Sequence, residues 1–272
     1  MRVALYQART GIDPAANARD LAAAVAGAAA GGAAILFTPE MSGLLDRDRQ
    51  RAAVHYRHEA DDPVLAAVRA AAAEHSIWVA LGSLAMLAED EERLVNRSFL
   101  IDGGGAVRAR YDKMHLFDVD LPTGESWRES ASFRPGDAAV VAETPLGKLG
   151  LSICYDLRFP ALYQALSGAG ATMLSIPAAF TVPTGEAHWH VLMRARAIEN
   201  ACFVIAAAQC GSHEDGRATY GHSLVVDPWG KVLLDMGGEG PGLGFADLDL
   251  AASQAVRSRL PVIAHRRVIP AL

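Results

Sequence analysis

The 272-residue chain has few cysteines, no block of positive charge and no long apolar segment. Its three cysteines, Cys154, Cys202 and Cys210, form no CxxC pair, which argues against a disulfide framework and against a zinc ribbon. Lysine and arginine (25) are outnumbered by aspartate and glutamate (31), and no run of five basic residues occurs. With a formal net charge of −6, we expect neither nucleic acid nor a membrane surface as a partner.

The chain has no eighteen-residue apolar span, and its first residues enter a strand-like pattern directly, without a basic and apolar leader. We therefore expect a cytoplasmic protein whose thiols are reduced. Hydrophobic residues make up 51% and charged residues 21%, and no linker divides the sequence. This composition predicts one large domain over residues 1–272 that acts on a small molecule.

Short apolar runs rich in β-branched residues alternate with longer alanine-rich runs, as is typical of an α/β protein. In the first third, the pattern predicts strands at 3–8, 34–38 and 77–82 and helices at 15–30 and 64–74. Two further runs flank Gly103-Gly104-Gly105 and predict an antiparallel hairpin at 95–101 and 107–111. The sheet is therefore expected to be mixed.

The second half repeats this order of elements. We expect a strand at 148–153, helices at 161–167 and 188–200, and strands at 172–176, 203–208, 223–227, 232–235 and 244–246. The segment between the halves, 118–137, reads as a long irregular loop, which is often functional. Together these elements predict two packed mixed sheets with helices outside, a four-layer sandwich.

Cys154 stands in the stretch SICYDLRFP, where an apolar strand ends and a helix is expected to begin. Backbone N–H groups at such a junction favour a thiolate and an oxyanion formed beside it. A buried cysteine is more often a small apolar side chain. Catalysis therefore depends on whether the chain also supplies a base and an oxyanion partner.

Two polar residues follow predicted strands and meet this requirement. Glu40 follows the apolar run ILFTP, where partial burial would raise its pKa and make it a better base for a thiol. Lys113 ends another strand, and its ammonium could stabilise an oxyanion and lower the pKa of the thiol. The alternatives are an ion-paired loop glutamate and a solvated surface lysine.

A second glutamate lies in the irregular loop. Glu129, in WRES, could orient Lys113 or a substrate amide. Glu125 in the same loop competes with it, and spacing alone does not choose between them.

The four motifs FTPE, YDKMHLFD, WRES and SICYDLRFP together resemble the carbon–nitrogen hydrolase (nitrilase) superfamily over nearly the whole chain. The resemblance implies an αββα sandwich that assembles as a homodimer or higher oligomer and needs no cofactor or metal. It implies that Cys154 is the nucleophile, Glu40 the general base, Lys113 the stabiliser of the tetrahedral intermediate and Glu129 a supporting glutamate. The backbone N–H of Tyr155 would complete the oxyanion site.

Within the superfamily, the segments AAAQCG and YGHSLVVDPWG resemble the deaminated glutathione amidases, with the omega-amidases as the near alternative. The loop 123–128 departs from both patterns. Both substrates carry a 2-oxo acid end, which needs a cation or several donors. Arg158, four residues after Cys154, is the expected anchor, with a salt bridge to Asp156 or another local acid as the alternative. Phe180 and Thr184 resemble pocket positions of the family, in a loop after Pro177.

Specific residues argue against three other functions. A metallohydrolase could use His188 and His190 with His213, Glu214 or Asp215. However, this HxH pair opens a predicted helix, in which the side chains of residues i and i+2 point in different directions. The glycines of 237–244 lack the GxGxxG spacing of a dinucleotide site. An inactive binding protein of the same fold is disfavoured because Cys154, Glu40, Lys113 and Glu129 are all present. Cys202 and Cys210 are assigned to the core.

Overall fold

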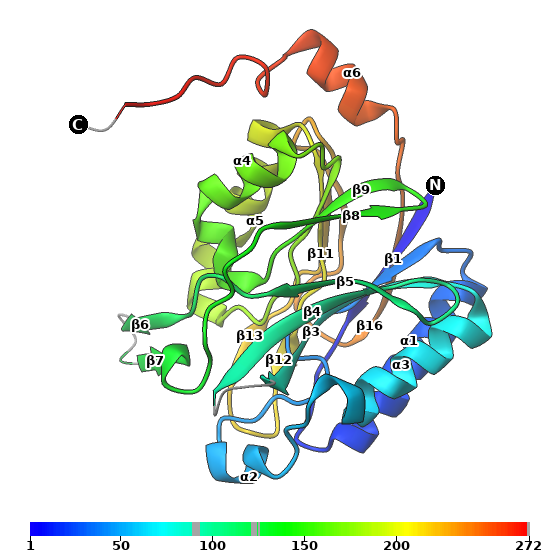
Figure 1. Cartoon of the computed structure of the whole chain (residues 1–272), viewed down its shortest axis with the longest axis vertical. Coiled ribbons are helices and arrows are strands. Elements are labelled where there is room, and N and C mark those ends of the chain that lie inside the picture. Colours follow the sequence, from blue (N-terminus) through cyan, green and yellow to red (C-terminus); the bar gives the residue numbers. More distant parts are fainter. Residues whose placement is uncertain (89–92, 121–123, 125, 271–272) are drawn as a thin grey trace.

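The computed structural model describes residues 1–88, 93–120, 124 and 126–270. In this part of the chain, two six-stranded sheets pack face to face, with helices on both outer sides (Figure 1). The first sheet has the order β16 (Gly242–Asp247), β1 (Arg2–Gln7), β2 (Ile35–Phe37), β3 (Trp78–Leu87), β4 (Leu94–Ile101) and β5 (Val107–Asp112). The second has the order β15 (Val232–Asp235), β14 (Leu224–Val226), β11 (Phe203–Ala206), β10 (Met173–Ser175), β9 (Gly147–Leu151) and β8 (Val140–Thr144).

Each sheet has three parallel central strands and antiparallel strands at its margins. In the first sheet β1, β2 and β3 are parallel, and β4 and β5 form the expected antiparallel hairpin. In the second sheet β9, β10 and β11 are parallel. The mixed sheets and their repeated order confirm the fold class expected from the sequence.

The helices fall into two outer layers and several short pieces. α1 (Pro14–Ala30) and α3 (Pro63–His75) cover the first sheet, and α4 (Pro160–Gly168) and α5 (Val182–Asn200) cover the second (Figure 1). The short pieces are α2 (Arg49–Ala53), α6 (Ala252–Arg259) and the 3₁₀ turns η1 (Glu59–Asp61), η2 (Glu129–Ala131) and η3 (Cys154–Arg158). No helix in the described part of the chain has the length and apolar character needed to cross a bilayer.

Local sequence explains where the two helices on the first sheet begin. Each starts at an Asp-Pro pair, in which the aspartate caps free backbone N–H groups and the proline fits the first helical turn. Asp13 accepts a hydrogen bond from Ala15 N at 2.9 Å, and Asp62 accepts one from Leu65 N at 2.7 Å. Behind these caps, apolar side chains of both helices pack on the outer face of the first sheet.

Two segments differ from the sequence expectation. α5 begins at Val182 rather than at His188, because Pro183 is tolerated in a first helical turn and Gly185 lies where a Cβ would strike the ring of Tyr220. The region 118–137 contains the two-stranded ribbon of β6 (Asp118–Asp120) and β7 (Ser126–Arg128) and the turn η2, so it is not irregular throughout. Glu125 and residue 123 of the divergent loop lie outside the described residues.

Candidate active site

The carboxyl ends of strands from both sheets bring three of the predicted residues, Glu40, Lys113 and Cys154, together. Glu40 follows β2, Cys154 follows β9, and the segment after β10 lies between them. Gly82 of β3 allows the chain at 38–40 to pass closely, because a Cβ there would lie 2.1 Å from Thr38 O. The N–H of Gly82 also donates to Thr38 Oγ1 at 3.0 Å. This fixes the backbone that carries Glu40.

Cys154 occupies a sharp turn between strand and helix. It is the first residue of η3 and has φ 49°, a left-handed conformation that costs energy for a residue with a Cβ. Its N–H donates to Pro177 O at 2.8 Å, and the residue is 7% exposed. The helix expected here is a separate 3₁₀ turn, and α4 starts afresh at Pro160. The N–H of Tyr155 belongs to this first turn, whose N–H groups have no acceptor within the helix.

Lys113 is enclosed between two carboxylates. Its Nζ lies 2.9 Å from Glu40 Oε1 and 2.9 Å from Glu129 Oε2, and all three residues come from different segments. The Lys113 side chain is only 2% exposed. Glu40 also accepts a hydrogen bond from Ala179 N at 3.0 Å, and Glu129 accepts one from Phe117 N at 2.7 Å. The three charged groups are therefore held rigidly.

Asn96 joins the same network and was missed from the sequence. Its Nδ2 donates to Glu40 Oε1 at 3.0 Å and to Glu129 Oε1 at 3.2 Å. Its Oδ1 is buried without a hydrogen-bond partner among the described residues. The signal available was a polar side chain in the middle of the apolar run of β4.

The electrostatics of the thiol are set mainly by burial. Burial raises the pKa of Cys154 well above its usual value, the carboxylate of Glu40 raises it further, and Lys113 lowers it only in part. Burial also disfavours the ammonium of Lys113, but Glu129 and Glu40 outweigh it, so the pKa of Lys113 lies well above its usual value. Lys113 thus lowers the pKa of the thiol, as expected from the sequence, but desolvation exceeds the attraction of this one ammonium and the net shift is upward.

A cavity of about 330 Å³ opens over this cluster. Glu40, Lys113, Glu129, Cys154 and Tyr155 all line it, together with Asn96, Arg158, Phe180 and Thr184. Its size is that of a small-molecule site rather than a macromolecular groove.

The three residues expected to bind substrate have defined neighbours. Arg158 places its guanidinium 5.7 Å above the ring of Phe180 and 3.3 Å from His188 Nδ1. Asp156, its expected alternative partner, is fully buried and accepts hydrogen bonds from Tyr111 Oη at 2.6 Å and Ile153 N at 2.8 Å. Thr184 lies in the first turn of α5 rather than in a loop, with its hydroxyl 2.8 Å from that of Thr181.

Comparison with known proteins identifies the family of this chain. The model of the carbon-nitrogen hydrolase family matches residues 2–258. The chain belongs to the carbon–nitrogen hydrolase family. Several relatives of 42–47% identity are named deaminated glutathione amidase, among them the protein of Yersinia enterocolitica, which is 42% identical over 250 residues (89% of this chain and 84% of that protein).

Solved structures of this family have the same fold. The NitFhit protein of Caenorhabditis elegans superimposes with a TM-score of 0.90 at 37% identity, over 98% of this chain and 65% of that chain. A mutant amidase from Nesterenkonia sp. AN1, in which acrylamide has added to the active-site cysteine, gives a TM-score of 0.80 at 30% identity, over 96% of this chain and 98% of that one. This carbon–nitrogen hydrolase is therefore an αββα amidase.

Further residues of this carbon–nitrogen hydrolase line the cavity without having been predicted. The guanidinium carbons of Arg47 and Arg217 lie 5.4 and 5.2 Å from the centre of the Trp127 ring. Arg217 pairs with Asp215 at 2.6 Å, whereas the Arg47 guanidinium makes no hydrogen bond or ion pair with any described residue. Arginines in loops give no sequence signal, because only the fold brings residues 47, 127 and 217 together.

The residues of the metallohydrolase hypothesis are dispersed in this hydrolase. His213 is buried and lies 2.7 Å from Thr219 Oγ1, whereas His188 faces Arg158 and His190 lies beside Asp235. Cys202 and Cys210 are buried, as expected, and the Cys202 thiol donates to Ala171 O at 3.1 Å.

Proposed function

We propose that Cys154, Glu40, Lys113 and Glu129 hydrolyse an amide through a cysteine thioester. The observation that carries the proposal is the contact of Glu40 and Glu129 with one buried ammonium beside the thiol, inside a small cavity. In the first step, Glu40 takes the proton of the Cys154 thiol and the sulfur attacks the amide carbonyl carbon. The carbonyl oxygen becomes an oxyanion between Lys113 Nζ and the N–H of Tyr155.

Glu40 also carries the protons of the remaining steps. The carbon–nitrogen bond breaks as Glu40 returns its proton to the departing amine, leaving an acyl group on Cys154. Glu40 then deprotonates a water molecule that attacks the thioester, and the acid leaves as the thiol is regenerated. Glu129 keeps Lys113 in place while Glu40 is protonated. The adduct on the active-site cysteine of the Nesterenkonia amidase supports a thiol nucleophile.

We infer that the amide is deaminated glutathione, which would be cleaved to 2-oxoglutarate and cysteinylglycine. The names of the relatives support this substrate. So do the charges of the cavity, since the substrate carries a carboxylate at each end. Arg158 supplies a cation near Cys154, and Arg47 supplies a second whose guanidinium is not paired with any described carboxylate. Phe180 and the Thr184 hydroxyl provide an apolar wall and a polar contact.

Two measurements test this proposal. Replacing Cys154 with alanine is expected to abolish hydrolysis while preserving the fold, whereas Cys202→Ala, the matched control at a buried thiol, retains activity. Wild-type turnover by Cys154→Ala contradicts the mechanism. For the substrate, kcat/KM for deaminated glutathione is expected to exceed that for 2-oxoglutaramate. The opposite preference would make the enzyme an omega-amidase without affecting the mechanism.

We also propose that the enzyme is a cytoplasmic homo-oligomer. Three free cysteines fit a reducing compartment. Large apolar side chains at the surface support self-association. Val191 and Ile198, two turns apart on α5, are 69% and 43% exposed, and Trp229, next to the Gly230 that lies against Ile198, is 66% exposed. Light scattering of the purified protein tests the oligomeric state, and a monomer at micromolar concentration contradicts it.

A further inference from the structure

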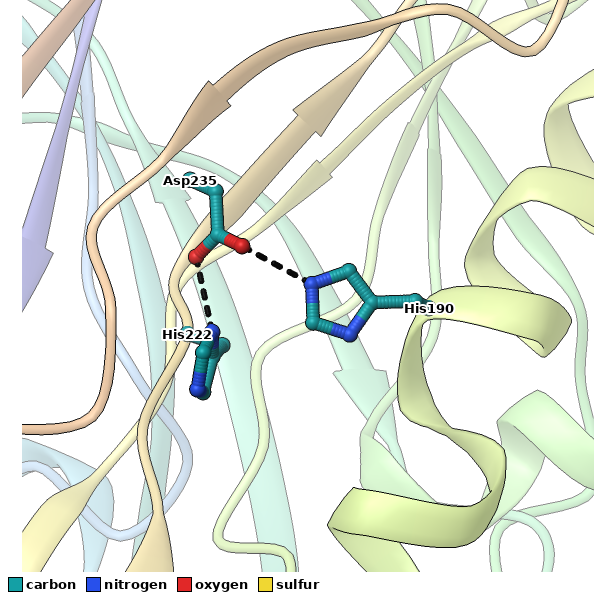
Figure 2. A group of neighbouring side chains, drawn as sticks. All are labelled: His190, His222 and Asp235. Carbon is teal, nitrogen blue, oxygen red and sulfur yellow. Dashed lines mark hydrogen bonds and ion pairs between the residues drawn. The ribbon is translucent and has the colours of Figure 1, made fainter.

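A cluster of two histidines and an aspartate lies apart from the residues that line the catalytic cavity. His190 comes from α5, Asp235 ends β15, and His222 precedes β14, and the three side chains converge (Figure 2). Asp235 bridges the rings, with Oδ2 2.8 Å from His190 Nε2 and Oδ1 2.9 Å from His222 Nδ1. All three are partly exposed, with side-chain exposures of 34% for His190, 25% for His222 and 32% for Asp235.

We propose that His190, His222 and Asp235 form a binding site for a divalent transition-metal ion of the zinc type. Their ligand atoms lie within 4.8 Å of one another. Ligands of tetrahedral zinc lie about 3.3 Å apart, given metal–ligand distances of about 2.0–2.1 Å. Small rotations of partly exposed rings close that difference, and the ion takes the place between the rings and the carboxylate.

The types of donor select the ion. Two imidazole nitrogens and one carboxylate suit zinc, cobalt or nickel, whereas calcium and magnesium prefer oxygen ligands alone. Three protein ligands leave a fourth position for water or for Glu186, which lies one helical turn before His190 on α5. No proton is lost when both rings are neutral, because each ring moves its N–H to the nitrogen facing away from the ion.

The surroundings hold the ligands in place before an ion arrives. The ring of Tyr220 stacks on His222 at 4.3 Å between centroids. His222 has φ 55°, a conformation uncommon for a residue with a Cβ, and its N–H and C=O are both engaged, with Gly237 O at 2.7 Å and Trp189 Nε1 at 2.8 Å. Such outer contacts are typical of sites whose ligands are oriented in advance.

The site is independent of the thiol chemistry, so its test removes that thiol. In a Cys154→Ser background, which deletes the cavity thiol as a competing metal ligand, titration with Co²⁺ is followed by visible absorption and titration with Zn²⁺ by calorimetry. We expect a single tight ion per chain and the absorption of tetrahedral Co²⁺. His190→Ala and His222→Ala should each weaken binding by at least about tenfold, whereas His75→Ala, the control at an exposed histidine of α3, should not.

A variant that keeps the hydrogen bonds separates metal binding from folding. In Asp235→Asn the amide oxygen accepts from one ring and the amide nitrogen donates to the unprotonated nitrogen of the other. The melting temperature in EDTA should therefore stay near that of the parent, but Zn²⁺ should raise that temperature much less. Absence of saturable binding, or affinity kept in both histidine variants, overturns the proposal and leaves a hydrogen-bonded His–Asp–His group.

Discussion

Replacing Glu40 with glutamine removes the proposed base while changing the side chain very little. The glutamine carbonyl can still accept the hydrogen bonds that Lys113 Nζ and Asn96 Nδ2 now donate to Oε1. At the position of Oε2, however, its amide group would face the N–H of Ala179, which now donates at 3.0 Å. Two donors then meet, so this one hydrogen bond is lost.

The contacts of Glu40 give the expected sizes of the loss in stability and of the loss in rate. Leaving the partly buried N–H of Ala179 unsatisfied costs at most about 1–3 kcal/mol of stability, and Lys113 keeps its ion pair with Glu129, so the fold should survive. Loss of a general base lowers the rate by about 10²–10⁴-fold. This corresponds to about 2.7–5.4 kcal/mol in the barrier. Activity should therefore fall far more than stability.

The assay is kcat/KM for amide hydrolysis, combined with intact-protein mass spectrometry to detect an acyl group on Cys154. Glu143→Gln is the matched control, because Glu143 is an exposed carboxylate outside the catalytic cavity. A folded Glu40→Gln protein with kcat/KM within threefold of the wild type would refute the assignment of the base.

Three further predictions concern residues around the site. Arg47→Gln should raise KM for deaminated glutathione by roughly 10–100-fold, the value of a charge-assisted hydrogen bond. It should have little effect on KM for 2-oxoglutaramate. Equal effects on both substrates contradict the role of Arg47 as the second cation that binds a substrate carboxylate. Asn96→Ala should lower kcat by about tenfold or more with KM nearly unchanged, and steady-state kinetics at several pH values check it. Burial lowers the pKa of His213, so the unfolded chain binds the proton first. The free energy of unfolding should fall as the pH drops below about 6.5, by at most about 1.4 kcal/mol per pH unit from this group. Denaturant titrations compare this slope with that of His213→Gln, and an unchanged slope contradicts the prediction.

The fold could be predicted from the sequence because its periodic signals are local. Apolar runs and Asp-Pro caps mark β1, β2, α1 and α3, and the glycine turn marks the hairpin of β4 and β5. The start of α5 was missed because Pro183 and Gly185 resemble a loop, although one fits a first helical turn and the other accommodates Tyr220. The local sequence does not show the tertiary contact between Gly185 and Tyr220.

The residues of the candidate site likewise fall into those that the sequence predicts and those that it does not. Glu40 and Cys154 follow parallel strands. Lys113 follows β5, which runs in the same direction as β3 because two antiparallel pairings separate them, so all three residues stand at the carboxyl ends of strands. Asn96 lies within a strand, and Arg47 and Arg217 lie in surface segments, so their positions depend on side-chain directions and loop paths. The net pKa shift of the Cys154 thiol could not be predicted from the sequence either, because it depends on how far burial outweighs the charge of Lys113.

The enclosure of Lys113 by two glutamates explains how a thiol with a raised pKa can still react in the proposed mechanism. Before attack, the three charged groups and the neutral thiol carry a net charge of about −1 in a buried site. Moving the proton from Cys154 to Glu40 shifts the negative charge to the sulfur, and attack on the amide shifts it to the oxyanion. At each stage one negative charge besides that of Glu129 stays near the same ammonium, so no new buried charge is created and little reorganisation is needed. Glu129 makes this possible, because Lys113 would otherwise lose its only anchor when Glu40 becomes neutral.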